Sequence, residues 1–116
     1  MILHGNSIEI LKELEPESVD TVFTSPSPFG LGDKGFYIAS MGLLFREIHR
    51  VLKKEGCVWL QMGDFHDGSG VMQFVPEDTV KHLALNGWYL RSKCIWVRTE
   101  KFDYQDDYNR FARDWE

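Results

Sequence analysis

Residues 18–30 join an apolar, β-branched run to a rigid turn, Ser18-Val-Asp-Thr-Val-Phe-Thr-Ser-Pro-Ser-Pro-Phe-Gly30. The Val, Phe and Thr side chains at 19–24 favour an extended chain. Pro26 and Pro28 fix their own φ angles and keep the residues before them out of the helical region. The strand predicted at 19–24 therefore ends at a defined place. Because ligands bind beyond the carboxyl ends of strands in parallel α/β sheets, the turn is a candidate site.

The first half of the chain predicts further strands and helices around this turn. A short strand is expected at 1–4. Asn6, followed three residues later by Glu9, is a capping-box pattern that predicts a helix of about two turns. Apolar residues at helical spacing predict another helix that begins at Ser40, with Gly56 as its C-terminal cap.

The second half continues the alternation. A nearly all-apolar run predicts a strand at 57–62, which suits a sheet covered on both faces. A helix is expected at 77–86, with Gly87 ending it and with apolar side chains facing inward at Val80, Leu83 and Ala84. A long strand is expected at 88–97. These elements predict an α/β fold with a truncated Rossmann-like sheet and flanking helices.

Thr24-Ser25-Pro26-Ser27-Pro28-Phe29 resembles the catalytic tetrapeptide of the DNA amino-methyltransferases, which reads Asp, Asn or Ser, then Pro-Pro, then Tyr or Phe. Segments 3–11, 47–56, 56–64 and 87–96 resemble other segments of that family, in the same order. The resemblance implies a methyltransferase-type sheet, S-adenosylmethionine as the methyl donor and DNA as the partner. The acceptor it implies is the exocyclic amino group of cytosine or adenine, and a Ser at the first position favours cytosine.

The resemblance also implies roles for the turn residues. Ser25 and the Pro26 carbonyl would accept hydrogen bonds from the target amine, whose lone pair must turn towards the methyl donor. Phe29 would stack on a base flipped out of the duplex, and Pro28 stiffens the turn. Glycines around this turn predict a mobile segment through Tyr37 that could close over the flipped base.

The turn departs from the family pattern at Ser27, which separates the two prolines. Either one residue is inserted, or Ser27 replaces a proline and the frame shifts. A displacement of ~1 Å at such a site can cost about a hundredfold in rate. The alternative interpretation of the segment is an ordinary surface turn.

The candidate cofactor segment is Asp64-Phe-His-Asp-Gly-Ser-Gly70. It shares an Asp and a Gly-Ser-Gly spacing with the family's donor-binding motif, and it follows a predicted strand. That motif normally opens a helix, whereas residues 71–76 are predicted to be extended. Asp64 is therefore either a cofactor-binding residue or a turn residue that accepts backbone hydrogen bonds, and both interpretations stay open.

A chain of 116 residues is at most one domain. We expect residues 1–98 to form the methyltransferase-like catalytic portion and residues 99–116 to form an aromatic and acidic tail, predicted to be helical. Because the catalytic half alone is matched, a second polypeptide or a second copy of the chain could complete the site.

The formal net charge of −5 does not supply the basic face expected of a stand-alone DNA-binding protein. The one cluster of basic residues, Arg46, Arg50, Lys53 and Lys54, is predicted to be the solvated face of a helix. Phosphate contacts would then come from a local patch or from a partner.

Cysteine and histidine usage predicts no metal site. Cys57 and Cys94 fall in predicted strands, so we expect two buried free thiols. The four histidines have no metal-ligand spacing.

No signal peptide or membrane span is evident, and the cytoplasm is the expected location.

The function expected from the sequence is that of an S-adenosylmethionine-dependent DNA methyltransferase, represented by its catalytic portion. One alternative is a catalytically degenerate subunit with the methylase fold and a regulatory or structural role. A third possibility is a methyltransferase of the same fold that acts on RNA or protein, because fold and donor do not dictate the acceptor.

Overall fold

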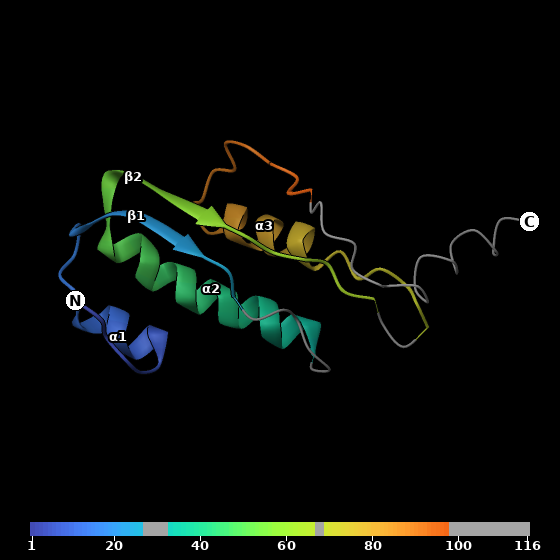
Figure 1. Cartoon of the computed structure of the whole chain (residues 1–116), viewed down its shortest axis with the longest axis horizontal. Helices are drawn as coiled ribbons and strands as arrows, with labels where there is room; N and C mark the ends of the chain where they lie inside the picture. Colours follow the sequence, from blue (N-terminus) through green and yellow to red (C-terminus); the bar gives the residue numbers. More distant parts are fainter. Residues whose placement is uncertain (27–32, 67–68, 98–116) are drawn as a thin grey trace, which may run out of the picture.

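The computed structural model describes residues 1–26, 33–66 and 69–97. Two strands of the described chain form a parallel sheet, and a long helix connects them (Figure 1). The elements follow in the order α1 (Ser7–Glu13), β1 (Val19–Thr24), α2 (Lys34–Val51), β2 (Leu52–Leu60) and α3 (Val75–Leu85). This alternation confirms the α/β class.

β1 matches the predicted strand residue for residue, and β2 runs parallel to it. Thr21 pairs with Cys57 and Thr24 pairs with Leu60, so the carboxyl ends of both strands lie at the same level. The register shifts between Val19 and Thr21, where the pairing is irregular. Because the two strands are parallel and end together, the residues that follow them lie along one edge of the sheet.

α1 confirms the predicted cap. The side chain of Asn6 accepts hydrogen bonds from the backbone N–H groups of Ile8 and Glu9, at 3.0 and 3.4 Å. The Glu9 side chain does not complete a capping box, because its carboxylate pairs with Lys12 at 2.9 Å. α1 ends at Glu13, and Leu14 is its C-cap residue.

α2 begins six residues before the predicted start at Ser40. Asp33 caps it, and its carboxylate accepts a hydrogen bond from the Phe36 N–H at 2.7 Å. Gly35 and Tyr37 therefore belong to the helix rather than to a mobile loop. Among the glycines of the predicted loop, Gly30 and Gly32 lie outside the described residues.

Gly56 is not a helix cap, which corrects the sequence-based prediction. α2 ends at Val51, β2 starts at the next residue, and Gly56 lies inside β2. A Cβ at Gly56 would lie 2.9 Å from the backbone oxygen of Asp20 and 2.6 Å from the Leu52 side chain. A glycine is needed here because the two strands approach each other closely.

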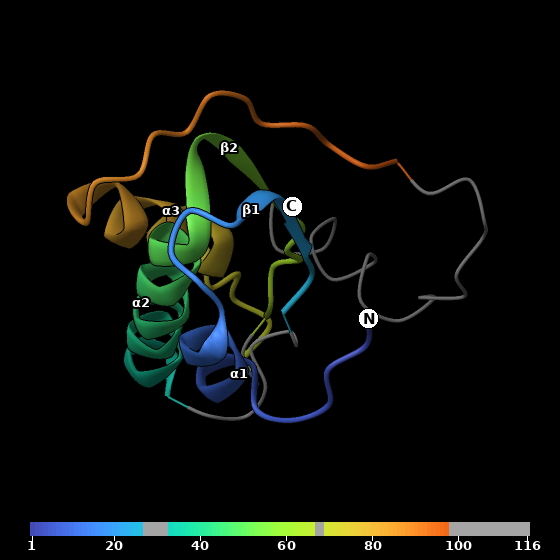
Figure 2. The ribbon, with the colours of Figure 1, turned by 90° about the vertical axis from the view of Figure 1, so that its left-hand side faces the viewer.

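The core lies between the sheet and the helices. Its buried members are Met41, Phe45, Ile48 and Leu83, and the strand residues Val22, Val58 and Leu60 pack against them. Figure 2 shows the helices gathered on one side of the sheet. One face of the sheet is thus covered, as the spacing of the apolar residues in α2 predicts.

The opposite face of the sheet is exposed within the described chain. Phe23 and Trp59 are neighbours across the strands and are 76% and 55% exposed. Cys57 is exposed on the same face, and Cys94 is exposed as well, so the expectation of two buried thiols is wrong for the described structure. The prediction of a sheet covered on both faces is also not met by the described residues.

Two predicted strands do not form in the described chain. Residues 1–4 and 88–97 have no strand partner there, and Ile95, Trp96 and Val97 are 84, 72 and 75% exposed. An apolar run becomes a strand only where another strand offers hydrogen bonds to its backbone. The predicted tail at 99–116 lies outside the described residues.

α3 begins two residues before its predicted start, with Pro76 in its first turn. Its buried side chains are Val75, Thr79 and Leu83, whereas Ala84 is exposed, contrary to its predicted inward orientation. Gly87 follows the helix with a φ of 90° and ends it as expected.

Among the described helices, none combines the length and apolar character that crossing a membrane requires.

Candidate functional site

The level carboxyl ends of β1 and β2 bring Ser25 and Gln61 together. Gln61 donates its backbone N–H to the Thr24 carbonyl at 3.0 Å, which continues the strand pairing one residue past β2. The Ser25 hydroxyl donates a hydrogen bond to Oε1 of Gln61. Ser25 is exposed and Gln61 is half-buried, so the hydroxyl is accessible from outside while its partner is held by the sheet.

The described structure places only part of the predicted catalytic turn. Ser25 stands at the sheet edge as expected, and Pro26 beside it is half-buried. Pro28 and Phe29 lie outside the described residues, together with the intervening Ser27. Their predicted roles therefore stay predictions.

Two described residues that flank segment 27–32, Ser25 and Lys34, contact the part of the chain that follows β2. At one end Ser25 bonds to Gln61. At the other end the Lys34 ammonium donates to the Gln73 carbonyl at 2.6 Å and pairs with Asp78 of α3 at 2.5 Å. The predicted catalytic turn is thus framed by contacts to residues 61–78.

Asp64 bonds to the backbone that leads into α3. Its Oδ1 accepts from the N–H groups of Phe65 and Val75 at 2.8 and 3.1 Å, and its Oδ2 accepts from the Phe74 N–H at 3.2 Å. Phe74 adopts a left-handed φ of 52° and offers no side-chain cap of its own. These contacts support the interpretation of Asp64 as a turn residue, and its cofactor role stays a prediction.

The segment after Asp64 folds back before α3 starts. His66 pairs with Met72 in an isolated antiparallel bridge, and the Gln73 N–H donates to the Phe65 carbonyl at 2.8 Å. A donor-binding glycine motif would run straight into a helix N-terminus. The described part of this segment returns on itself first, but α3 already begins at Val75, so the extended chain predicted at 71–76 is wrong for its last two residues.

Two carboxylates in the first turn of α3 are stabilised in their charged form. The hydrogen bond from Lys34 lowers the pKa of Asp78 below its usual value. The hydrogen bond from Lys93, at 2.7 Å, lowers the pKa of Glu77. Burial of the Tyr37 hydroxyl on α2 raises its pKa, so this phenol stays neutral near pH 7.

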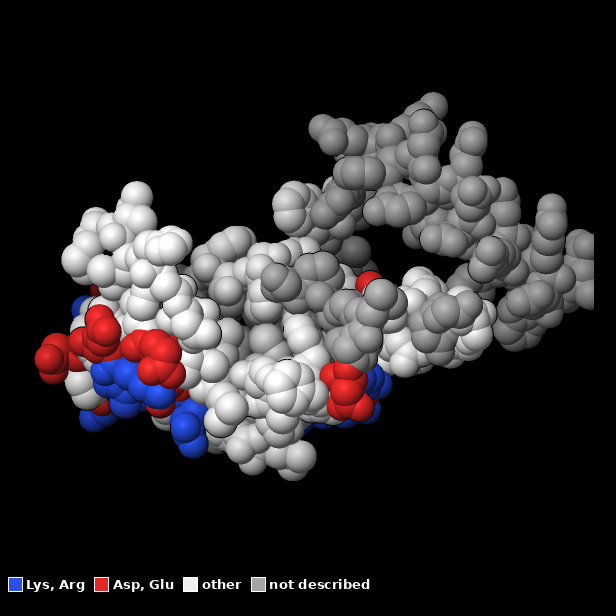
Figure 3. Space-filling view, turned by 90° about the horizontal axis from the view of Figure 1, so that it is seen from below, with Lys and Arg blue, Asp and Glu red and all other residues white. Residues whose placement is uncertain are grey.

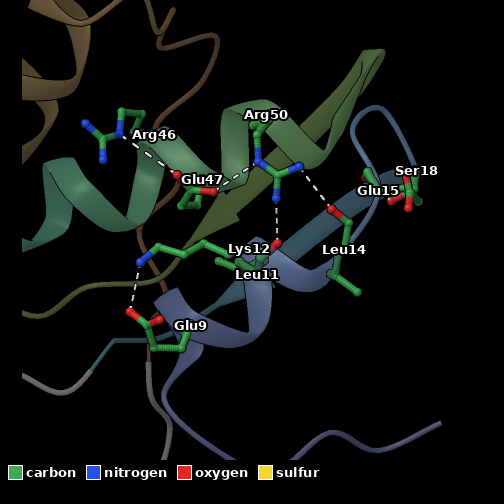
Figure 4. Close-up of polar contacts among 9 residues, drawn as sticks. All are labelled: Glu9, Leu11, Lys12, Leu14, Glu15, Ser18, Arg46, Glu47 and Arg50. Carbon is green, nitrogen blue, oxygen red and sulfur yellow. Dashed lines mark hydrogen bonds and ion pairs between the residues drawn. The ribbon is translucent and has the colours of Figure 1, made fainter.

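The predicted basic helix face is largely paired. The Arg50 guanidinium donates to the carbonyls of Leu11 and Leu14 and to the Glu47 carboxylate at 2.6 to 3.0 Å, so it holds α1 against α2 rather than facing solvent (Figure 4). Lys53 and Lys54 lie on β2, and Lys53 pairs with Asp20 at 2.7 Å. On the face that Figure 3 shows, Lys and Arg side chains lie beside Asp and Glu side chains.

An open hollow lies between α1, β1 and α2, next to the carboxyl end of β1. It encloses about 320 Å³ and is lined mainly by apolar side chains, among them Leu3, Ile10, Val22 and Leu44, with Thr24 at its edge. Small-molecule sites in proteins start at about 300 Å³. No local sequence pattern predicts this hollow, because its walls come from three separate elements.

A second, larger groove lies between α2 and α3. Its walls include Arg46, His49, His82 and Asn86, and His49 meets the Trp88 ring edge-on with the ring centres 5.4 Å apart. Within the described ranges, no group of three or more His, Cys, Asp or Glu side chains is placed to hold a metal ion.

Comparison with known proteins finds methyltransferases. The chain is 28% identical to the type II methyltransferase M.SfiI of Streptomyces fimbriatus, over 79% of its own length and 28% of the relative's. It is 28% identical to the type II methyltransferase M.SmaI of Serratia marcescens, over 82% and 46% of the two lengths. It is 32% identical to the DNA adenine methyltransferase YhdJ of Escherichia coli (strain K12), over 51% and 23%.

The chain spans less than half the length of each of these three relatives. No family model matches the chain. No solved structure matches it either. The similarity does not separate cytosine from adenine methylation. Over about four fifths of its length, the chain is similar to type II methyltransferases.

Proposed function

We propose that the chain is the catalytic portion of an S-adenosylmethionine-dependent DNA amino-methyltransferase. The observation that carries the proposal is the position of Ser25, which stands exposed at the carboxyl edge of two parallel strands. This is the edge at which α/β sheets bind their ligands. The similarity to type II methyltransferases supplies the reaction class.

In the proposed mechanism the turn acts on the target amine. The lone pair of an aromatic amine is delocalised into its ring, so the amine is a poor nucleophile. Ser25 and the Pro26 carbonyl accept hydrogen bonds from the two amine N–H groups and turn the lone pair out of conjugation and towards the methyl donor, while Phe29 stacks on the flipped base. Bound S-adenosylmethionine supplies the methyl group as an electrophile. The nitrogen lone pair would form the new N–C bond as the S–CH₃ bond of the donor breaks, S-adenosylhomocysteine would leave, and the methylated amine would lose one proton to water.

The donor site is the less complete part of the proposal. The hollow beside Thr24 has room for part of a donor molecule, but it is mainly apolar. The oxygens of Asp64, the candidate cofactor ligand, already accept three backbone N–H groups. We therefore propose that a second polypeptide, or a part of the protein that corresponds to the relatives' additional length, completes the donor site.

The role of Asp64 can be separated from its structural contacts. Replacing Asp64 by Ala removes a helix-capping acceptor and should cost about 1 kcal/mol of stability. Asp64→Asn keeps one amide oxygen and should cost less. If Asp64 also binds the donor, both variants lose donor affinity by more than their loss of folded protein explains. Titration calorimetry with S-adenosylmethionine and urea unfolding on the same variants measure the two effects.

Methyl transfer tests the proposed function directly. Labelled donor is incubated with duplex DNA containing unmodified cytosine and adenine, with the chain alone and with the complementary polypeptide. Phe29→Ala and Ser25→Ala should each lower kcat at least tenfold. Ser40→Ala, which loses only a hydroxyl bonded to the Phe36 carbonyl within α2, is the control. The base that gains the label decides between cytosine, which Ser25 favours, and adenine.

A degenerate subunit with the methylase fold is the second candidate function. The observation in its favour is that Asp64 bonds to backbone and the chain after it folds back before α3. A regulatory or structural subunit would bind neither S-adenosylmethionine nor S-adenosylhomocysteine down to a Kd of about 1 mM. It would also fail to support transfer when the complementary polypeptide is present, and that result would contradict the enzymatic proposal.

A further inference from the structure

Among the described residues, Gln61 is the one whose side chain accepts a hydrogen bond from the Ser25 hydroxyl. The two residues are 36 positions apart in sequence and meet because β1 and β2 end at the same level. We infer that Gln61 is a positioning residue for Ser25 in methyl transfer, an inference that rests on the proposed function.

The direction of the hydrogen bond gives Gln61 this role. A hydroxyl has one hydrogen to donate and two lone pairs that accept. The Ser25 hydroxyl donates its hydrogen to Oε1 of Gln61, so its lone pairs are directed elsewhere and remain free to accept from an amine. Without that acceptor the hydroxyl rotates, and its hydrogen can bond to the amine lone pair that must attack the methyl group.

The sheet holds the Gln61 side chain in place. Its backbone N–H bonds to the Thr24 carbonyl at 3.0 Å, one residue before Ser25, so the backbones on both sides of the pair are fixed by strand pairing. Gln61 is half-buried and Ser25 is exposed. The acceptor is therefore anchored while the hydroxyl faces the side from which a base can approach. This arrangement aligns the hydroxyl before substrate binds.

The test compares variants that keep or remove the acceptor. Gln61→Leu has similar size and cannot accept a hydrogen bond, whereas Gln61→Glu keeps an oxygen at the same distance along the side chain. We expect Gln61→Leu to lower kcat about tenfold, the value of one well-placed hydrogen bond, with KM for DNA and donor changed less than twofold. Gln61→Glu should retain most of kcat. Thermal unfolding of each variant checks that the fold is intact.

A double-mutant cycle separates positioning from a merely structural effect. In the Ser25→Ala background there is no hydroxyl to orient, so Gln61→Leu should lower kcat no further. An equal loss in both backgrounds would overturn the inference. So would a kcat for Gln61→Leu within twofold of the wild type.

The outcomes also separate this inference from the proposed function. If the wild-type protein transfers no methyl group, with or without the complementary polypeptide, the result contradicts both the proposed function and the role of Gln61. Wild-type protein that is active, with a Gln61→Leu variant equally active, leaves the function standing and removes only the role of Gln61.

Discussion

The Arg50 guanidinium connects α2 to α1 by donating hydrogen bonds to two backbone carbonyls. The last carbonyls of a helix lack the hydrogen bond from the residue four positions on, and an arginine near that end donates to them and complements the helix dipole. In α1 the Leu11 carbonyl also accepts from the Leu14 N–H, at 3.1 Å. Arg50 of α2 reaches the carbonyls of Leu11 and Leu14 at the end of α1, at 2.6 and 3.0 Å (Figure 4). The sequence shows a basic residue on a helix, but the two carbonyls lie 36 and 39 positions away.

Replacing Arg50 by Met should therefore destabilise the fold by about 1–2 kcal/mol, because charge-assisted bonds to carbonyls that are partly screened by solvent are lost. Urea unfolding followed by circular dichroism measures the change. Arg46→Met is the matched control, since the Arg46 side chain is 73% exposed and reaches Glu47 only at 4.0 Å. Equal stabilities of the two variants would contradict the role given to Arg50.

The hydroxyl group of Thr79 should also affect the stability of the fold. It is fully buried on α3, and among the described contacts its hydroxyl has no hydrogen-bond partner. Burying an unpaired hydroxyl costs about 1–3 kcal/mol by mutational measures. Thr79→Val keeps the shape and removes this cost, so it should stabilise the protein by about 1 kcal/mol.

The same unfolding assay tests this prediction, with Thr79→Ser as the comparison. The Ser variant keeps the hydroxyl and loses a buried methyl group, so its midpoint should fall while that of Thr79→Val rises. A fall for both variants would show that the Thr79 hydroxyl has a partner outside the described residues.

At the scale of elements, the start of α3 depends on charge. Asp78 pairs with Lys34 of α2 and Glu77 pairs with Lys93, and each pairing lowers the pKa of its carboxyl. A carboxyl with a lowered folded-state pKa contributes stability that is present above its unfolded pKa. That contribution is lost as the pH falls through the folded pKa. The contacts between α2 and α3 should therefore weaken on acidification below the usual carboxyl range.

Asp78→Asn tests this pH dependence. The variant lacks one titrating carboxyl, so its stability should change less between pH 7 and pH 3 than that of the wild type. Urea midpoints at both pH values give the comparison, and Asp33→Asn serves as a control, since its N-capping oxygen is retained. An unchanged pH dependence in Asp78→Asn would show that the Lys34 pairing contributes nothing to folding.

At the scale of the whole molecule, the described residues cover one face of the sheet and leave the other face exposed. Phe23 and Trp59 lie side by side on the exposed face, and the chain spans less than half the length of the relatives compared above. Two large aromatic side chains exposed side by side on a sheet are suited to packing against another polypeptide. This face is where the proposed complementary polypeptide would pack.

Replacing both Phe23 and Trp59 by Ser should weaken binding of the complementary polypeptide at least tenfold, because two aromatic contacts are lost. The stability of the isolated chain should change little, since both side chains are largely exposed in it. Titration calorimetry measures the first effect and urea unfolding the second. Leu85→Ser, an 87% exposed residue on α3, is the control for a general loss of surface hydrophobicity.

The elements that the sequence predicted correctly are those decided within a few residues. β1 has its predicted bounds because β-branched residues are followed at once by prolines. The Asn6 cap of α1 and the Gly87 end of α3 also follow from neighbouring backbone groups. The position of Ser25 at the sheet edge belongs to this set, because it needs only the end of one strand.

Only the tertiary structure decided what depends on distant partners. Gly56 had the pattern of a helix cap, but the close approach of Asp20 makes it a strand residue. Residues 88–97 had the pattern of a strand but form no strand in the described chain. The bond between Ser25 and Gln61 has no local signal, because it arises when two strands far apart in sequence end at the same level. Local sterics and helix capping depend on residues that are neighbours in sequence. Strand pairing and side-chain contacts across the sheet depend on residues that come together only when the chain folds.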